Sequence, residues 1–557
     1  MNRTLAFLVA LALAAPLFAQ KKPAEPEQPK LVESIDVRVI DFDVVVTDRR
    51  GNYVTGLKQE DFELLENGVP KTITNFYEVE GSSSRTLQAG EVGGKVQAPA
   101  AEASQPEEMK RRIIFYIDNL SLAPFNRNRV FQEMKNFIRT TMRPGDEAMV
   151  ATYNRSMKVR VPFTRDPAQI DSILDSIARE SAMGVANRSE RKQTEDRIRE
   201  ASSYQDAVAT ARSYAASVEH DLRQSVASIN ALMSTLAGVE GKKILVLTSE
   251  GFPMQPGREV FQFIDETARE KGWQESGSTF LEGMTFDGTT LIQSIGKAAN
   301  ANDITLYTIH AAGLSGGNEN SAENARPTSA MVSHAALTNT TDSMQLMAQM
   351  TGGLASVNTN NFKDAFKKIQ RDLESYYSLG YRAGTERVDR QRYIQVRVKN
   401  KEYRARSRQT FVEKSVYAEM SDRVVASLLY RVKDNDLGII ARVGRPIPVD
   451  DGLFRVSVDI QIPMPMLTLL PQGETESAGG FDVYVVVGNR NNDMSDVARK
   501  SHQLRVSTAD LKEISGKFYT YTLELIIEKG LNRISIGVVD QISSTSGFAR
   551  EQIIAQN

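Results

Sequence analysis

The sequence predicts an α/β fold, a doubly wound and mostly parallel sheet, flanked by a small N-terminal β-domain and a C-terminal β-sandwich. Within residues 111–385, apolar runs such as "IIFYI" and "ILVLT" alternate with stretches of helical spacing. Apolar strands separated by helices indicate a parallel sheet covered on both faces. Residues before and after this region alternate in strand fashion, with Asn-Gly-type turns in the N-terminal part, which is typical of antiparallel β-structure.

The chain opens with the pattern of a secretory signal peptide, "MNRTLAFLVALALAAPLFAQ". A basic residue, a short apolar run and a small residue at Ala19 predict a signal over residues 1–19. No later apolar stretch approaches the ~20 residues that span a bilayer. We therefore expect an exported protein, periplasmic or extracellular, with no membrane span in the mature chain.

Composition narrows the class of protein. The net charge of −2 has no basic surplus, so we expect no nucleic-acid partner. The content of 41% hydrophobic and 25% charged residues is that of a globular chain. There is no cysteine, which excludes thiol catalysis and Cys-ligated metals.

Shifts in composition divide the rest of the chain. The segment between the small β-domain and the α/β domain is rich in Gly, Ser, Ala, Pro and Glu, which indicates a flexible linker. After the α/β domain, "YIQVRVK" and "YRARSR" suggest an antiparallel hairpin. The predicted order is a small β-domain over 31–80, a linker over 81–110, the α/β domain over 111–385, a β-hairpin extension over 386–411 and the β-sandwich over 412–557.

A long, charged helical excursion interrupts the α/β domain at about residues 184–238. Its charges are spaced for i,i+4 pairs, so the simplest interpretation is a solvated helical face. A helical projection beside the ligand-binding edge of the sheet would also suit a partner or a self-contact. The charge pattern leaves both interpretations open.

Polar residues gather where two predicted strands end. In a doubly wound sheet, ligands bind beyond the carboxyl ends of the strands, at the point where the strand order reverses. If strands 113–117 and 243–248 are neighbours there, Asp118, Asn119, Ser121, Ser249 and Glu250 share one cleft. Carboxylates and hydroxyls in one crevice suit a hard cation such as Mg²⁺.

At these residues the chain resembles the von Willebrand factor A domain, a Rossmann-like α/β fold. The motifs that carry the resemblance are "RPGDEAMVATYN", "KKILVLTSEGFP", "ITLYTIHAAG" and "MAQMTGGLASVNTNNFKDAFKKIQRDLESYYSLGYRA". Together with "VVVTDRRGNYVTGLKQEDFELLENG", the last of these looks like the exported von Willebrand-A-related proteins typical of Acidobacteria. The resemblance implies an adhesion-like role, with a metal-ion-dependent adhesion site at which an acidic group of the partner completes a Mg²⁺ shell.

The predicted metal ligands depart from that family pattern. Asp118 matches its first ligand, but Leu120 and Leu122 stand at its two hydroxyl positions. Ser121 between them, and Glu250 in place of an Asp, are the remaining candidate ligands. The nearest threonine for the middle-loop position is Thr194.

The residues of this degenerate site also have structural interpretations. Asp118 would accept hydrogen bonds from the amides of its own loop. Glu250 would be a solvated loop carboxylate. Under these interpretations no cofactor is bound, and the cleft still offers a face for a protein.

Signals of catalysis are weak. "GLSGG" at 313–317 places Ser315 in a Gly-x-Ser-x-Gly motif, but no helical pattern follows it, as a nucleophile elbow requires. The histidines at 220, 310, 334 and 502 lack metal-ligand spacing, and His310 ends a predicted strand.

We therefore expect a non-catalytic bacterial protein that binds a protein or a cell-envelope ligand through its cleft, for adhesion or as a scaffold. One alternative is a self-assembling structural protein of the envelope, a homo-oligomer that uses its β-edges or the helical excursion. A further alternative is a hydrolase that uses the carboxylate pair or Ser315.

Overall fold

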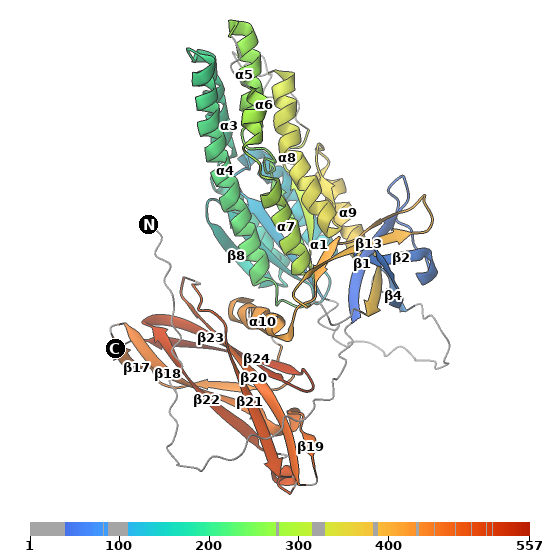
Figure 1. Ribbon diagram of the computed structural model, residues 1–557, viewed down its shortest axis with the longest axis vertical. Helices are drawn as coiled ribbons and strands as arrows, with labels where there is room; N and C mark the ends of the chain where they lie inside the picture. The colour runs from blue at the N-terminus through green and yellow to red at the C-terminus, as the bar shows by residue number, and fades with distance from the viewer. Residues whose placement is uncertain are drawn as a thin grey trace. The chain divides into compact units, whose positions relative to one another are not determined.

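The computed structural model divides the chain into two compact units, one of residues 37–234 and 240–413 and the other built mainly from residues 414–557 (Figure 1). The predicted signal peptide and most of the predicted linker lie outside the described residues. These are 39–81, 83–86, 110–273, 278–314, 329–382, 388–430, 434–450, 452–473, 475–491, 493–507, 509–514 and 516–556.

The first unit contains a six-stranded, mostly parallel sheet in the order β11-β10-β9-β6-β7-β8. Only β8 runs antiparallel, paired with β7. β6 and β9, the two predicted neighbours, are adjacent and parallel, so the strand order reverses between them. The strands are β6 (Arg111–Asp118), β7 (Glu147–Tyr153), β8 (Met157–Thr164), β9 (Lys242–Ser249), β10 (Ile304–His310) and β11 (Ala355–Ser356).

Helices cover both faces of this sheet. On one face, buried side chains of three helices pack with those of the strands in a single core, which contains Phe115, Val150 and Val246. These helices are α1 (Pro124–Thr141), α2 (Pro167–Arg179) and α9 (Phe362–Glu374). On the other face, the Met344 carbonyl accepts a hydrogen bond from Thr308 of β10. The helices that contact β10 there are α7 (Thr289–Ala301) and α8 (Ala330–Thr351).

The predicted excursion at 184–238 is a pair of helices, α3 (Gly184–Glu200) and α4 (Tyr204–Thr235). They share a buried core with α5 (Arg258–Lys271), in which Ile198 and Tyr204 meet Phe261 and Phe263. Figure 1 shows α3, α4, α5 and α8 extending together beyond the sheet, with the short α6 (Thr279–Met284) beside them. The excursion therefore has a buried side in addition to the solvated face that its charges predict.

Two antiparallel sheets in the same unit form a β-sandwich. Their strands come from the parts of the chain before β6 and after α9. Their orders are β14-β1-β12-β4-β5 and β15-β13-β2-β3, and Phe42, Leu64, Tyr377 and Ile394 belong to their common core. The strands are β1 (Val39–Thr47), β2 (Phe62–Glu66), β3 (Val69–Lys71), β4 (Ile73–Glu80), β5 (Ser83–Thr86), β12 (Ser375–Arg382), β13 (Gln391–Val398), β14 (Arg404–Arg406) and β15 (Thr410–Val412).

This sandwich corrects three predicted boundaries. β12, assigned to the α/β domain, lies between β1 and β4 of the sandwich. The hairpin expected at 386–411 is absent from the described strand pairs, because β13 pairs with β2 and β15 whereas β14 pairs with β1. β5 pairs with β4 inside the segment predicted as linker. Local strand patterns cannot reveal partners that lie about 300 residues away.

Asp372 of α9 joins the sandwich to the parallel sheet. Its buried carboxylate accepts hydrogen bonds from Tyr53 (2.6 Å) and from Arg406 of β14 (2.7 Å). Its second oxygen accepts one from Tyr307 of β10 (3.1 Å). One carboxylate is thus shared by three elements that are distant in sequence.

The second unit is an antiparallel β-structure with one long helix. β18 pairs with β16, β17 and β22, and in the other sheet β20 lies between β21 and β23. Phe454, Phe481 and Leu525 are part of the core between them, and α10 (Val416–Tyr430) packs on the second sheet. The strands are β16 (Ile440–Val443), β17 (Ile447–Asp450), β18 (Leu453–Pro463), β19 (Leu470–Gln472), β20 (Glu476–Asn489), β21 (Ala498–Ser507), β22 (Phe518–Glu528), β23 (Gly530–Asp540) and β24 (Ser546–Ala555), with a short α11 (Leu511–Ile514).

Asp372→Ala should destabilise the first unit by about 3–5 kcal/mol, because it leaves the partly buried Arg406 guanidinium without its carboxylate. Urea unfolding followed by the fluorescence of Trp273, the one tryptophan of the chain, measures this change. The control is Asp364→Ala on the same helix, which removes a half-exposed i,i+4 pair worth about 0.5 kcal/mol. Equal shifts for the two variants would contradict the role given to Asp372.

Candidate functional site

The carboxyl ends of β6 and β9 hold a hydrogen-bonded cluster of side chains. Because these strands are parallel neighbours, Asp118 and Ser249, their last residues, lie at the same edge of the sheet. The Asp118 Oδ2 atom accepts hydrogen bonds from Ser121 Oγ (2.7 Å) and Ser249 Oγ (2.8 Å). The two hydroxyl oxygens are 2.9 Å apart. We call Asp118, Ser121 and Ser249 the strand-end network.

Backbone amides complete this network. The second oxygen of Asp118 accepts from the amides of Leu120 (3.2 Å) and Ser121 (3.4 Å) in its own loop. Across the gap, the Glu250 amide donates to Ser121 Oγ (3.0 Å) and the Gly251 amide donates to Ser249 Oγ (2.9 Å). The loops after β6 and β9 are therefore held to each other through one buried carboxylate.

Burial decides the electrostatics of Asp118. The side chain is only 2% exposed, and this desolvation raises the pKa of its carboxyl group above the ordinary range. The two hydroxyls and the two amides act in the opposite direction, since they stabilise the charged form. Asp118 thus accepts hydrogen bonds from the amides of its own loop, as its structural interpretation predicts.

The carboxylate of Glu250 does not join the strand-end network. Its Oε1 atom accepts hydrogen bonds from the Ala123 amide (2.8 Å) and from Asn126 Nδ2 (2.9 Å). Its Oε2 atom lies 3.5 Å from Nη2 of Arg188, with which it forms an ion pair. Ala123 is the N-cap residue of α1 and has no side-chain oxygen to accept a hydrogen bond. Glu250 supplies a negative charge at this helix N-terminus from another loop.

Helix α3 covers the loop after β6. The amides of Met183 and Gly184 donate to the carbonyls of Asn119 (2.8 Å) and Leu122 (3.0 Å). A Cβ atom at Gly184 would lie 2.2 Å from the Ser121 carbonyl oxygen, so only glycine permits this approach. The first turn of the predicted excursion is thus in direct backbone contact with the candidate site.

Asn119, predicted as a ligand-binding residue, points away from the network. Its Oδ1 atom accepts a hydrogen bond from Arg127 (3.0 Å), and both side chains are buried. Arg127 also donates to the carbonyls of Ala178 and Glu180, which holds α1 to the end of α2. Asn119 therefore has a structural partner in the described chain.

Of the other sequence candidates, Thr194 lies away from the network, whereas His310 of β10 lies beside Ser249 of β9. Thr194 is buried in α3, where its hydroxyl donates to the Glu190 carbonyl, about 15 Å along the helix from Gly184. His310 ends β10 and is buried, which lowers the pKa of its imidazole. Ser315 falls outside the described residues.

Sequence reasoning missed Gly184, Arg188 and Asn126 at this site. Gly184 and Arg188 lie more than 60 residues from both loops that they contact, in a segment whose pattern is only helical. Their spacing offers no signal that would have placed them there.

The side-chain oxygens of the strand-end network fit one face of a Mg²⁺ octahedron. Neighbouring ligands at about 2.0–2.1 Å from Mg²⁺ lie about 2.9 Å apart, close to the 2.7, 2.8 and 2.9 Å separations of these oxygens. Asp118, Ser121 and Ser249 would hold the ion, whereas the Glu250 carboxylate is engaged with α1. Within the described residues, no three His, Asp or Glu side chains gather as a metal site. Of the three predicted ligands, Asp118 and Ser121 therefore lie together, whereas Glu250 lies outside the set.

Comparisons with known proteins match this chain to solved structures at low sequence identity. No protein-family model and no curated protein matches the chain. Among solved structures, a von Willebrand factor type A protein from Catenulispora acidiphila is 8% identical, with 89% of this chain and 73% of that chain covered and a TM-score of 0.25. The PilB minor pilin from Streptococcus sanguinis is 12% identical, with 61% and 89% covered and a TM-score of 0.26.

A third similar structure is an aerotolerance-related membrane protein from Bacteroides fragilis, 11% identical, with 48% of this chain and 98% of that chain covered and a TM-score of 0.24. TM-scores this low assign neither the fold nor the function. In the described part of the present chain, no helix is long and apolar enough to cross a membrane.

Asp118→Ala should destabilise the first unit by about 1–3 kcal/mol, because it leaves the buried hydroxyl of Ser249 and two loop amides without their acceptor. Urea unfolding monitored by Trp273 fluorescence measures the loss. The matched control, Asp342→Ala, removes an exposed carboxylate from α8 and should change the stability by less than about 0.5 kcal/mol. An unchanged midpoint for Asp118→Ala would contradict the pinning role.

Proposed function

We propose that this chain is an exported, non-catalytic binding or scaffold protein of the von Willebrand A type, with a degenerate metal-ion-dependent adhesion site. Its ligand, a protein or an envelope component, meets the edge of the parallel sheet where the strands end. The observation that carries the proposal is a set of exposed apolar side chains on segments that meet this edge of the sheet. Phe125 is 74% exposed, Val185 55% and Leu314 59%.

These three side chains belong to segments at one edge of the sheet. Phe125 follows β6 in the first turn of α1, and Leu314 follows β10. Val185 is in the first turn of α3, whose backbone touches the β6 loop. Large apolar side chains left exposed at one edge of a domain favour an interaction surface there. We call Phe125, Val185 and Leu314 the apolar rim.

The strand order supports the assignment to the von Willebrand A type. Counted along the sheet from β8, the strands follow the order 3-2-1-4-5-6 of doubly wound folds, and the network lies where that order reverses. With the sequence motifs, this order favours the family fold. Fold alone does not define the ligand, so the role rests on the apolar rim.

We propose no catalytic step at this edge. An activated serine needs a base that is itself oriented by a third group. Asp118 accepts from Ser121 and Ser249 together, and two amides of the facing loop donate to the same two hydroxyls. These contacts suit a fixed structural network.

Titration calorimetry of the full chain with Mg²⁺ should give no saturable heat. Leu120 and Leu122 replace the hydroxyl ligands of the family pattern, and the Glu250 carboxylate is engaged with α1. Saturable binding that Asp118→Ala abolishes and Asp342→Ala retains would instead identify a working magnesium site.

A photoreactive benzoylphenylalanine at position 125 should crosslink the chain to a ligand in intact cells that export it. The same residue at position 280 is the control, because Phe280 is 69% exposed on α6, which packs on α5 and belongs to none of the three rim segments. An adduct from position 125 alone supports the proposal. Adducts from both positions or from neither contradict it, and an adduct of two copies favours the self-assembling alternative.

A further inference from the structure

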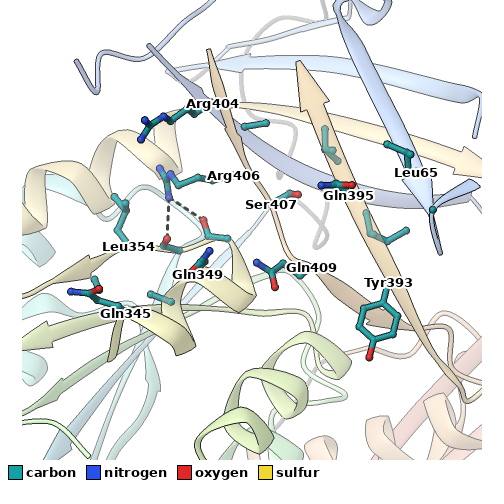
Figure 2. Close-up of a pocket in the computed structure, with 18 of the residues that line it drawn as sticks. Leu65, Gln345, Gln349, Leu354, Tyr393, Gln395, Arg404, Arg406, Ser407 and Gln409 are labelled. Atoms are coloured by element: carbon teal, nitrogen blue, oxygen red, sulfur yellow. Dashed lines mark hydrogen bonds between the residues drawn. The ribbon is translucent and has the colours of Figure 1, made fainter. Parts of the chain in front are cut away.

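The first unit contains an open groove, called the canyon, that shares no residue with the strand-end network or the apolar rim. Its volume is about 1180 Å³, and it lies between the outer face of the sheet that contains β13 and the C-terminal end of α8. Figure 2 shows the side chains that face it from both sides, with segment 404–409 between them. Its lining includes Gln345, Gln349, Tyr393, Gln395, Arg404 and Gln409.

The sequence pattern explains why polar side chains line both walls. Along β13, Ile394 and Val396 are buried in the sandwich core, so Tyr393 and Gln395 point to the outer face. On α8, Gln345 and Gln349 are four residues apart and exposed on one side of the helix. Each wall therefore has a buried apolar side and an amide-bearing side.

Arg406 fixes the floor of the canyon. Its guanidinium donates to the carbonyls of Gly352 (3.0 Å) and Gly353 (3.2 Å) and to Asp372 (2.7 Å). A Cβ atom at Gly353 would lie 1.9 Å from the Leu306 carbonyl oxygen, so this turn is pressed against β10. The shape of the canyon is therefore set by the packing of α8, β10 and β14.

The chemistry of the lining is that of amides, an aromatic ring and a cation. Tyr393 is 63% exposed. The side-chain amides of Gln345, Gln349 and Gln409 have no hydrogen-bond partner among the residues that the structure describes, and Arg404 has no carboxylate partner among them. The lining contains two arginines and no Asp or Glu.

We propose that the canyon binds an acidic oligosaccharide. Each sugar hydroxyl donates and accepts a hydrogen bond, and so does a glutamine amide, which makes amides good partners for neighbouring hydroxyls. The exposed ring of Tyr393 offers a flat apolar surface for the C–H face of a sugar ring. Arg404 has the planar fork that binds a carboxylate through two hydrogen bonds.

The strand pairing disfavours a peptide in this place. β13 pairs with β15 over residues 391–393 and with β2 over residues 394–398. On its open side, the Ile394 amide already donates to the Gln409 carbonyl (2.8 Å), which closes the canyon end. An added peptide strand would find only a very short free edge.

The canyon should bind a glycan without cleaving it. Hydrolysis of a glycosidic bond by the usual mechanism needs two carboxyl groups on either side of that bond. The described lining provides none. The inference therefore adds a second binding site to the proposed function and does not depend on the strand-end edge.

Affinity electrophoresis of the full chain, in gels that contain polygalacturonate or neutral dextran, tests this proposal. We expect polygalacturonate to retard the protein, and Tyr393→Ala to weaken binding by about tenfold. Tyr77→Ala is the matched control, since Tyr77 is 37% exposed on β4 outside the canyon, and it should bind as the parent does. Arg404→Gln should remove the preference for the acidic glycan, whereas Arg390→Gln, also exposed, should retain it.

The outcomes separate the alternatives. Retardation that Tyr393→Ala does not change, or no retardation by either polysaccharide, overturns the proposal. Tyr393-dependent binding of an acidic peptide without glycan binding overturns it as well and identifies a peptide site. Equal affinity for dextran overturns the acidic assignment. Crosslinking from position 125 tests the strand-end edge separately, because its residues do not line the canyon.

Discussion

A buried carboxylate that several distant segments share is the constraint on which the first unit depends. Asp372 accepts from Tyr53, Tyr307 and Arg406, which come from the start, the middle and the end of the unit. A buried charge is tolerated only where it is paired and hydrogen-bonded, so these three side chains must meet. The sandwich is thereby fixed against the parallel sheet, and the canyon walls are fixed with it.

Asp118 repeats this arrangement at the edge of the sheet. Its carboxylate accepts hydrogen bonds from two hydroxyls and two amides in place of water. These bonds hold the loops after β6 and β9 together. The family resemblance implies that such residues hold a metal ion. Here the same oxygens already satisfy one another, while Glu250 has turned to the N-terminus of α1. The shape of this edge therefore depends on hydrogen bonds within the chain.

The two proposed binding surfaces differ in chemistry. The apolar rim of Phe125, Val185 and Leu314 would gain free energy from burial of apolar area. The canyon offers amides, the ring of Tyr393 and the guanidinium of Arg404, which favour a polar and acidic ligand. A chain with both surfaces could hold a partner at one place and a glycan at another, which is the behaviour expected of a scaffold.

The sequence alone determined the mixed α/β class and the meeting of the loops that carry Asp118, Ser121, Ser249 and Glu250, because apolar runs and helical periods are local signals. Tertiary structure alone decided that β12 to β15 belong to the sandwich, that Gly184 rests on the Ser121 carbonyl, and that Glu250 faces α1. Strand partners and buried hydrogen bonds join residues up to about 300 positions apart in the chain. Local spacing and composition do not indicate which of these distant residues will meet.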